Sequence, residues 1–588
     1  MGLHKEIHFE TEICNYLATH GWLYAEGEAA QYDRALALFP KDVLAWVRES
    51  QPKAWETLCK NHGSQAGETL LARLREQINQ RGTLDILRQG IDLLGLKSSL
   101  KIAEFKPALA INQDILKRYA SNRLRIVRQV RYSLHNENCL DLVLFLNGVP
   151  IATAELKTDF TQSIGDAIDQ YRFDRVPNPK GKPAEPLLSF PRGALVHFAI
   201  SNLEVHMVTR LAGPATRFLP FNQGDHGAAG NPVNPKGGHR SAYLWEQVWE
   251  RESWLEILGR YCIAKRDKKK NLESFIFPRY HQLGVTRKLQ QAVLADGPGT
   301  KYLIQHSAGS GKTNSIAWTA HFLAELHDDQ NKKVFDTVLV VSDRTVIDSQ
   351  LKEALFDFQR TTGVVASIQG EGGSKSKELT EALDGSKKVV VCTIQTFPHA
   401  LEMVRQLAAT QNKRFAVIAD EAHSSQTGEA ASKLKALLGP EELAELEDGG
   451  EIGTEDLLLA QMASRVRDGG ITFVAFTATP KNKTMELFGT RPDPKRKPAA
   501  DNVPHPFHVY SMRQAIEEGF ILDVLQNYTS YKLAFQLAHE GRELDEKEVE
   551  KSAALKRVMG WVKLHPYNIA QKVQVVVEHF REFVAPLL

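Results

Sequence analysis

The stretch YLIQHSAGSGKTNSIAW, from Tyr302 to Trp318, constrains the fold more than any other part of the chain. It reads as a short apolar strand, then a turn of small residues, then a helix that opens at Lys312 and Thr313. In this arrangement the N–H groups of the turn point at phosphate oxygens, the lysine reaches the β- and γ-phosphates, and the threonine hydroxyl ligates Mg²⁺. The residues expected at such a site are Gly309, Ser310, Gly311, Lys312 and Thr313. His306 stands where the strict pattern has its first glycine, and a plain Gly/Ser turn is the alternative for this stretch alone.

An acidic motif follows another apolar run, Phe415 to Ala419, and has the sequence Asp420-Glu421-Ala422-His423. Carboxylates at the C-terminal end of a strand lie where open α/β sheets bind their ligands. We therefore expect Asp420 to hold Mg²⁺ and Glu421 to polarise the water that attacks the γ-phosphate of ATP. A solvated acidic turn is the alternative when this tetrapeptide is taken alone.

Three further β-branched runs are separated by polar segments of helix length: Thr337 to Arg344, Val389 to Phe397 and Ile471 to Pro480. Strands that alternate with helices predict a parallel, doubly wound sheet. The order of GSGKT, DEAH and TATP resembles motifs I, II and III of superfamily 2 helicases and translocases. This resemblance implies a RecA-like motor domain that uses ATP and Mg²⁺.

Three more residues take their roles from this resemblance alone. Thr477 and Thr479, in TATP, are implied to couple the nucleotide state to domain movement. Gln282, in FPRYHQLGV, stands where such motors read the adenine edge, and an ordinary surface glutamine is the alternative.

Length and charge narrow the possibilities further. A chain of 588 residues is expected to form about three domains, because a single core rarely exceeds about 250–300 residues. With a net charge of +2, contacts with nucleic acid have to come from local patches. No apolar signal segment or membrane-length apolar run occurs, so we expect a cytoplasmic protein with no membrane part. The five cysteines show no paired spacing, which argues against a disulfide framework or a zinc site.

Two charged stretches are expected to be solvated connectors. AKRDKKKN, Ala264 to Asn271, precedes the predicted motor, and RPDPKRKPAA, Arg491 to Ala500, follows its third motif. Contacts with the DNA backbone are the alternative for both stretches.

The segment CLDLVLFLNGVPIATAELK, Cys139 to Lys157, reads as two apolar strands around an Asn-Gly dipeptide, which is a strong hairpin signal. Glu155 and Lys157 are two residues apart on the second strand, so their side chains share one face. Asp141 lies early on the first strand. Two carboxylates beside a lysine are the minimum for metal-dependent phosphodiester cleavage, with Asp141 and Glu155 on Mg²⁺ and Lys157 on the attacking water. The pattern alone is weak, because E-x-K triplets are common on exposed strands.

The turn of this hairpin decides whether the two carboxylates can meet. If the Asn-Gly dipeptide formed a regular two-residue hairpin, Asp141 and Glu155 would project from opposite sides of the sheet. One extra residue restores the pairing, and a proline just after the turn, which cannot donate a ladder hydrogen bond, favours such an irregularity. We therefore predict an odd-length connection or a β-bulge between Phe145 and Ile151, with both carboxylates close enough to share one ion.

A series of segments resembles, in this order, the R (HsdR) subunit of type I restriction enzymes. They are GTLDILRQGI, NRLRIVRQVRYS, LDLVLFLNGVPIATAELK, TRLAGPATRFLPFN, FPRYHQ, HSAGSGKT, DEAHSSQTG, FTATPKNKTMELFG and VYSMRQAIEEGFILDVLQNYTSY. The resemblance spans nearly the whole chain and implies a PD-(D/E)-x-K nuclease fold for the first domain, with Asp141, Glu155 and Lys157 in the metal and water roles. It also implies Gln170 as a site residue from a Q-x-x-x-Y element, although position 174 is an aspartate. A glutamate of the family's N-terminal helix maps onto Glu10, for which helix capping is the alternative.

Together these arguments predict three parts. Residues 1–260 form a nuclease-like α/β domain, residues 261–500 a first RecA-like domain, and residues 501–588 a connector with the beginning of a second motor domain. No Q-x-x-G-R-x-x-R helix follows Pro480, so the sequence is expected to be a fragment of a longer subunit.

The resemblance implies an ATP-dependent translocase and Mg²⁺-dependent endonuclease that cuts double-stranded DNA together with separate methylation (M) and specificity (S) subunits. Two alternatives stay open. One is a stand-alone superfamily 2 helicase or translocase whose N-terminal domain only binds DNA. The other is a non-catalytic module gated by ATP.

Overall fold

The computed structural model describes residues 6–342, 351–420 and 470–523, with gaps at 110, 160–161, 268–271, 357–363, 369–374, 386, 394–395, 481, 494, 497–498 and 500, and scattered positions between 569 and 581. The chain divides into two compact units, Met1–Phe520 and Ile521–Leu588. The expected beginning of a second motor domain falls largely outside the described residues.

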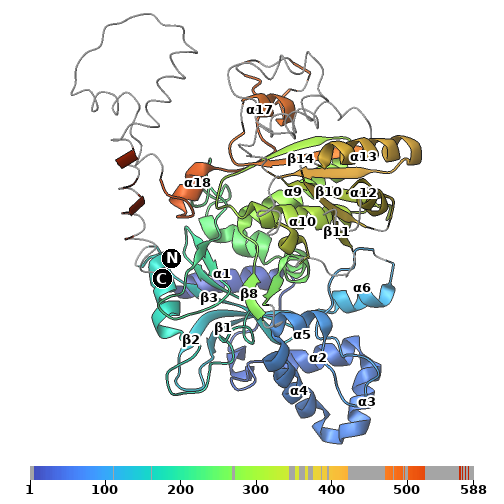
Figure 1. The fold of residues 1–588 in the computed structure, drawn as a ribbon. Coiled ribbons are helices and arrows are strands. Elements are labelled where there is room, and N and C mark those ends of the chain that lie inside the picture. Colours follow the sequence, from blue (N-terminus) through green and yellow to red (C-terminus); the bar gives the residue numbers. More distant parts are fainter. Residues whose placement is uncertain are drawn as a thin grey trace, which may run out of the picture. The chain divides into compact units, whose positions relative to one another are not determined.

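The N-terminal part of the first unit is built around a six-stranded mixed sheet with the strands in sequence order (Figure 1). Its strands are β1 (Leu124–Arg131), β2 (Cys139–Leu146), β3 (Val149–Leu156), β4 (Val196–Ile200), β5 (Val205–Val208) and β6 (Leu219–Pro220). Neighbouring strands are antiparallel, except that β4 runs parallel to β3. Every residue of β3 is buried, as expected for a central strand that is covered on both faces.

Helices cover the two faces of this sheet. On one face, α1 (Glu6–Thr19) inserts Phe9, Ile13 and Leu17 into a core shared with β1, β2 and β3. On the other face, α7 (Ile164–Asp169) and the one-turn helix η3 (Gln170–Asp174) contribute Ala167 and Tyr171 to a separate cluster. The helices that precede the sheet in the chain are α2 (Pro40–Ser50), α3 (Pro52–His62), α4 (Ala66–Arg81), α5 (Thr83–Gln89) and α6 (Gln113–Ala120).

The second sheet has seven strands in the order β11-β12-β10-β13-β14-β9-β15, and every neighbouring pair is parallel. The strands are β9 (Lys301–His306), β10 (Thr337–Ser342), β11 (Val365–Ser367), β12 (Val389–Thr393), β13 (Phe415–Ala419), β14 (Ile471–Thr477) and β15 (His508–Tyr510). The predicted strand–helix alternation is therefore confirmed. Because β15 pairs with β9, the sheet continues beyond residue 500.

Alternate residues of this sheet enter different cores. Along β10, Val338 and Val340 join the core that contains side chains of α9 (Tyr280–Asp296) and α10 (Lys312–Ala324), whereas Leu339 and Val341 join the core of α12 (Lys375–Asp384) and α13 (Phe397–Gln411). Helices thus cover both faces of the sheet, as Figure 1 shows. The predicted fold class, a nuclease-like α/β part followed by a doubly wound parallel sheet, is confirmed.

The charged stretch before the motor is not a plain connector. β7 (Ile263–Arg266) pairs antiparallel with β8 (Leu272–Ile276), so the basic run interrupts a two-stranded hairpin. The prediction of a solvated linker over 264–271 is wrong for its first residues. It failed because the charged composition of the segment says nothing about a pairing partner further along the chain.

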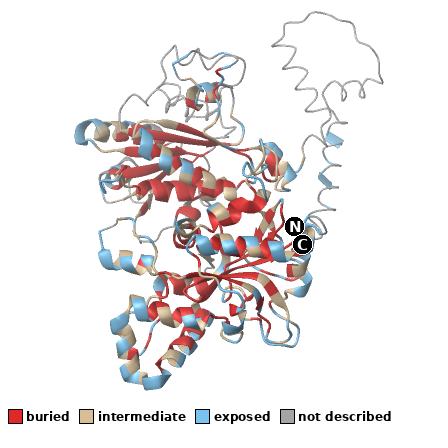
Figure 2. Cartoon of the chain, turned by 180° about the vertical axis from the view of Figure 1, so that it is seen from behind, coloured by how far each residue is buried: buried red, intermediate tan, exposed pale blue. Residues whose placement is uncertain are grey.

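An aromatic seam joins the two sheets within one continuous core. Trp249 packs edge-on against Phe198 of β4, with ring centroids 5.6 Å apart. On the motor side, the ring of Tyr261 lies 5.6 Å from that of Trp318 on α10, and the Trp318 indole N–H donates to the Tyr261 carbonyl oxygen (3.1 Å). These side chains belong to a single buried cluster, and Figure 2 shows buried residues running through both parts.

The described residues of the first unit also form several short elements. They are η1 (Glu28–Gln31), η2 (Gly63–Gln65), η4 (Arg240–Ala242), η5 (Leu244–Val248), α8 (Arg251–Glu256), η6 (Ile257–Tyr261), α17 (Asn482–Phe488) and α18 (Met512–Glu517). In the part of the chain that the structure describes, no helix combines the length and the apolar character needed to cross a bilayer.

Candidate functional sites

The β2–β3 hairpin combines a tight turn with a β-bulge. Asn147 and Gly148 form a two-residue turn with φ angles of 51° and 80°, a backbone region that asparagine and glycine tolerate best. The register then shifts between Leu144 and Phe145, which leaves Ile151 as the extra residue on β3. The bulge predicted between Phe145 and Ile151 is confirmed, whereas the connection itself keeps two residues.

Beyond the bulge, the register brings the candidate metal ligands to the same face. Leu142 faces Ala154, so the next position outward places Asp141 opposite Glu155. Asp141 Oδ2 accepts a hydrogen bond from the backbone N–H of Leu156 (2.8 Å), which holds its carboxylate against β3. Without the extra residue, Asp141 would face Ala154 instead.

Glu155 is fully buried, and its two oxygens have different surroundings. Oε1 accepts a hydrogen bond from Arg175 Nε (2.6 Å), whereas Oε2 is buried without a hydrogen-bond partner. Burial raises the pKa of Glu155 well above its usual value, and the charge of Asp141 raises it further, while Arg175 opposes the shift. The two carboxylates are thus close enough to compete for one proton or one cation.

The carboxylate pair fits a hard divalent cation. Carboxylate oxygens are the ligands that Mg²⁺ prefers, and a cation beside Glu155 Oε2 would satisfy a buried oxygen that now has no partner. Across the described ranges, no three His, Cys, Asp or Glu side chains converge as a ready-made metal cluster. An ion at Asp141 and Glu155 would therefore complete its shell with water or substrate phosphate, as Mg²⁺ commonly does.

Lys157 comes directly after β3, two residues beyond Glu155. Its side chain is only 5% exposed, and its ammonium group lies 3.1 Å from Glu6 Oε1 on α1. The amine thus lies beyond the C-terminal end of β3, beside the first turn of α1.

Glu10 and Gln129 lie beside the Asp141–Glu155 pair, and the sequence analysis singles out Glu10 alone. The Glu10 carboxylate accepts hydrogen bonds from Arg128 Nε (3.0 Å) and Gln129 Nε2 (2.9 Å) on β1. Gln129 Nε2 also lies 3.3 Å from Asp141 Oδ1, so it links two carboxylates. Burial and the charge of Asp141 raise the pKa of Glu10.

Gln170 and Arg175 lie at the two ends of η3. The side-chain oxygen of Gln170 is buried and has no hydrogen-bond partner, while neighbouring Tyr171 contacts the hydroxyl of Thr153 (2.7 Å), which precedes Glu155 by two residues on β3. Arg175 follows the wide turn of η3 and reaches Glu155. Sequence reasoning missed Arg175 because an ordinary helical spacing from Gln170 does not describe this wider turn.

The candidate nucleotide site starts at the C-terminal end of β9. Gly309 and Gly311 adopt left-handed backbone conformations, with φ of 72° and 76°, and Ser310 between them is buried. Gly311 caps α10, so Lys312 and Thr313 occupy its first turn. This is the predicted strand–turn–helix geometry of a phosphate-binding loop.

The start of α9 holds the carbonyl groups of this loop. Arg279 Nη1 donates to the Gly309 carbonyl (3.1 Å), and Gln282 Nε2 donates to the Gly311 carbonyl (3.1 Å). His281 Nε2 lies 2.9 Å from the Ser310 carbonyl. Because the peptide unit is planar and trans, fixing each carbonyl outward directs the next N–H toward the opposite, inner side of the loop.

Gln282 is buried with both ends of its amide engaged. Its oxygen accepts from the backbone N–H of Arg279 (2.9 Å), and its nitrogen contacts the loop. The role of Gln282 in reading adenine stays a prediction.

Other predicted residues lie at the ends of neighbouring parallel strands. Thr477 ends β14, and its buried hydroxyl has no hydrogen-bond partner; Thr479 is exposed two residues later. Asp420 directly follows β13, and its backbone N–H donates to Val341 of β10 (3.0 Å). Glu421 lies outside the described residues.

His306 is the last residue of β9 and directly precedes the phosphate loop. Its Nε2 lies 2.9 Å from Nδ1 of His508 on β15, and its ring is fully buried. Burial lowers the pKa of His306 well below its usual value, so the ring is neutral at physiological pH. The Lys312 ammonium lies 3.2 Å from the His306 carbonyl oxygen.

Two family descriptions match the sequence. Residues 26–216 match the type I restriction enzyme R protein N terminus (HSDR_N), and residues 281–557 match the SWI2/SNF2 ATPase family. The first match contains the Asp141–Glu155 hairpin, and the second contains the phosphate loop.

Relatives with names of the same kind are similar at low identity. The chain is 20% identical over 446 residues to a Methanocaldococcus jannaschii protein named "Putative type I restriction enzyme MjaVIIIP endonuclease subunit", covering 73% of this chain and 40% of that protein. It is 22% identical over 535 residues to the type I restriction enzyme HindI endonuclease subunit of Haemophilus influenzae, covering 87% of this chain and 44% of that protein. The chain thus spans less than half the length of these two relatives.

A solved structure, "The fragment structure of a putative HsdR subunit of a type I restriction enzyme from Vibrio vulnificus YJ016", is 17% identical. The similarity covers 67% of this chain and 56% of that one, with a TM-score of 0.25.

Proposed function

Because this chain is an HsdR-like protein, with an R-protein N-terminal domain ahead of a SWI2/SNF2-type ATPase domain, we propose that it is the motor and nuclease subunit of a type I restriction enzyme. Its motor hydrolyses ATP to translocate double-stranded DNA, and its nuclease cuts that DNA after translocation. Separate methylation and specificity subunits supply sequence recognition, and the complex works in the cytoplasm.

The pairing of Asp141 with Glu155 is the observation that carries the nuclease half of this proposal. A fully buried carboxylate that faces a second carboxylate is costly, and such pairs are concentrated at functional sites. We assign Asp141 and Glu155 as ligands of Mg²⁺, which, when bound, supplies Lewis-acid activation of the scissile phosphate.

The surrounding side chains have supporting roles in this proposal. Lys157 orients the attacking water and stabilises negative charge that develops on the phosphate. Gln170, whose buried oxygen has no partner, accepts a hydrogen bond from the same water. Arg175 holds Glu155 in place through its 2.6 Å ion pair.

In the motor half, the inner N–H groups of the phosphate loop and Lys312 hold the nucleotide phosphates. Thr313 and Asp420 hold the Mg²⁺ that accompanies ATP, and Glu421 activates the hydrolytic water. Gln282 reads the adenine edge. Thr477 and Thr479 transmit the nucleotide state, which is supported by the buried and unpartnered Thr477 hydroxyl at the end of β14.

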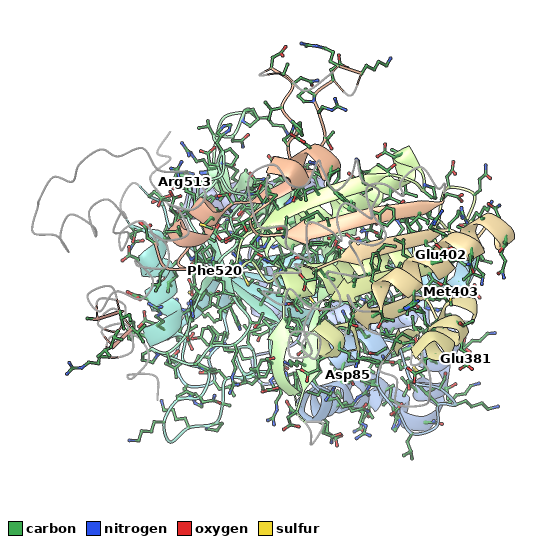
Figure 3. All side chains as sticks on the ribbon, turned by 45° about the horizontal axis from the view of Figure 1, so that its top comes forward. Asp85, Glu381, Glu402, Met403, Arg513 and Phe520 are labelled. Carbon is green, nitrogen blue, oxygen red and sulfur yellow. The ribbon has the colours of Figure 1, made fainter. Side chains whose placement is uncertain are left out.

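The test is DNA cleavage by the full subunit assembled with its methylation and specificity subunits, in the presence of ATP and Mg²⁺. Asp141→Ala, Glu155→Ala and Lys157→Ala should each abolish cleavage and leave DNA-stimulated ATPase activity within about two-fold of wild type, because the two sites use different sheets. Lys312→Ala should abolish both nucleotide binding and cleavage. Glu402→Ala, at an exposed position on α13, is the matched control (Figure 3).

The outcomes separate the proposal from its alternatives. Cleavage that survives loss of Asp141 and Glu155 would favour a helicase or translocase whose N-terminal domain only binds DNA. Loss of ATPase activity together with cleavage in the three nuclease variants would instead make these residues structural.

A further inference from the structure

We propose that Arg279 and Glu518 form a buried clamp that sets the shape of the phosphate loop, so that Glu518 is a positioning residue for nucleotide binding although it lies outside the nucleotide-binding motifs. The inference deepens the proposed ATP-binding function and rests on it.

Arg279 connects the loop to α18 and its C-terminal flank. Its Nη1 donates to the Gly309 carbonyl (3.1 Å), and its Nη2 lies 2.9 Å from Glu518 Oε2. The Tyr510 hydroxyl completes a triangle, because it accepts from Arg279 (2.6 Å) and donates to Glu518 (2.6 Å). The other oxygen of Glu518 accepts from Gln514 Nε2 (2.8 Å).

Aromatic rings fix the plane of the guanidinium. The Arg279 Cζ atom lies 3.6 Å from the ring centroid of Phe520 and 5.0 Å from that of Tyr510. The side chains of Arg279 and Glu518 are only 8% and 3% exposed. Figure 3 labels Phe520 just beyond α18. Since the guanidinium is planar and its donors form a rigid fork, fixing this plane also fixes the direction of the bond to Gly309.

Removing the carboxylate would disturb the loop more than it disturbs α18. A buried guanidinium that loses its counter-charge pays a large desolvation cost, so it moves toward solvent or another acceptor. The Gly309 carbonyl then loses its donor, and the Gly309–Ser310 peptide is left with the Ser310 N–H bond to the Ser307 carbonyl (3.3 Å), so it can shift from its position at the phosphate site. A second contact of the same kind, from the Ser307 N–H to the Tyr510 carbonyl (2.9 Å), ties the loop to β15 as well.

The adjacent glutamate provides a natural control. Glu517 is on the same turn, but its carboxylate accepts from the backbone N–H of Ala229 (2.7 Å) and pairs with Arg513 (2.8 Å), away from the phosphate loop. Glu517→Gln and Glu518→Gln therefore make the same chemical change one residue apart, and only the second change reaches Arg279.

The experiment measures binding of Mg·ATP to the 588-residue chain by titration calorimetry, with thermal unfolding of each variant in the presence and absence of ATP. Glu518→Gln should weaken ATP binding about ten-fold, which corresponds to about 1.4 kcal/mol. Glu517→Gln should bind ATP within about two-fold of wild type. The increase in Tm that ATP produces should be smaller in Glu518→Gln alone. A merely structural loss would instead lower the Tm measured with ATP and the Tm measured without ATP by the same amount.

Each result has a defined meaning. ATP binding by Glu518→Gln that equals wild type, or equal weakening in both variants, would overturn the clamp while leaving the ATP-binding proposal intact. A wild-type chain that does not bind ATP would overturn both. If Glu518→Gln does not fold, Tyr510→Phe decides, because it removes only the hydroxyl that braces the pair; we expect weaker ATP binding by roughly three-fold, and unchanged binding would refute the clamp.

Discussion

At the scale of single residues, Glu155 combines complete burial with a neighbouring carboxylate. This arrangement lowers the stability of the metal-free protein, because two acidic groups are held together in a buried site. A bound cation would offset this cost. Asp141→Asn should relieve the conflict, since it removes one negative charge from the pair while its amide oxygen can still accept from the Leu156 N–H. We expect the free energy of unfolding of the metal-free chain to rise by roughly 1 kcal/mol.

The same variant should lose its response to Mg²⁺. Wild-type Tm should rise with Mg²⁺ concentration, and Tm of Asp141→Asn should not. Asp329→Asn, at an exposed position, is the control and should behave as wild type. A destabilised Asp141→Asn that still responds to Mg²⁺ would show that the ion binds elsewhere.

The raised pKa of Glu155 also predicts a pH dependence. Folding raises this pKa above its ordinary value of 4.5, so the folded chain binds this proton more tightly than the unfolded chain does. The stabilisation is therefore complete below pH 4.5 and is lost as the pH rises through the raised pKa. In metal-free buffer, Tm of Glu155→Gln minus Tm of wild type should increase with pH, and a constant difference would contradict the assignment.

Some site residues were predictable from the sequence because local patterns determine their positions. The hairpin places Asp141 opposite Glu155 once the bulge is included. Arg175 and Gln129 were not predictable. Arg175 depends on the wide turn of η3, and Gln129 depends on a left-handed backbone (φ of 50°) that non-glycine residues rarely adopt.

At the scale of elements, the β2–β3 turn is held against α2. A Cβ added to Gly148, which has φ of 80°, would collide with the Phe39 carbonyl oxygen and the Val43 side chain. Gly148→Ala should therefore destabilise the fold by roughly 3 kcal/mol or more, because backbone strain and overpacking add.

Gly181 separates these two effects. It has a similar φ of 74°, but an added Cβ would meet nothing within 4 Å. Gly181→Ala should cost only about 1 kcal/mol, the strain of the backbone alone. Chemical denaturation of the two variants measures the difference, and equal losses would mean that the turn does not press on Phe39.

The elements that sequence reasoning missed depend on distant partners. The phosphate loop and the β-branched strands each occupy a contiguous stretch of sequence, so the local pattern is sufficient to predict them. β15 has only three residues and becomes a strand because β9 lies beside it. β7 likewise needs β8, which follows a lysine-rich run that resembles a linker in composition.

At the scale of the whole molecule, the nuclease-like and motor-like parts share one continuous core. The proposed boundary near residue 260 therefore lies in packed helices rather than in an extended linker: η6 ends at Tyr261, whose ring contacts α10. Separate domains with a solvated linker usually unfold independently, whereas a shared core couples them.

We therefore expect the first unit to unfold in one calorimetric transition. Asp141→Asn and ATP should each shift this single peak rather than split it. Two transitions, with ATP moving only the upper or the lower one, would show that the aromatic seam does not couple the two parts.

The aromatic seam also gives the protein an optical reporter. Trp249 and Trp318 of the seam are fully buried, as is Trp254, whose ring lies 6.5 Å from that of Trp249. The indole N–H groups of Trp249 and Trp254 have no hydrogen-bond partner. Indole emission shifts to longer wavelength as its surroundings become more polar, so a closed seam keeps the intrinsic fluorescence of these residues blue. Any step of an ATPase cycle that opened the seam to water would redden the emission, and stopped-flow fluorescence would time that opening without an added label.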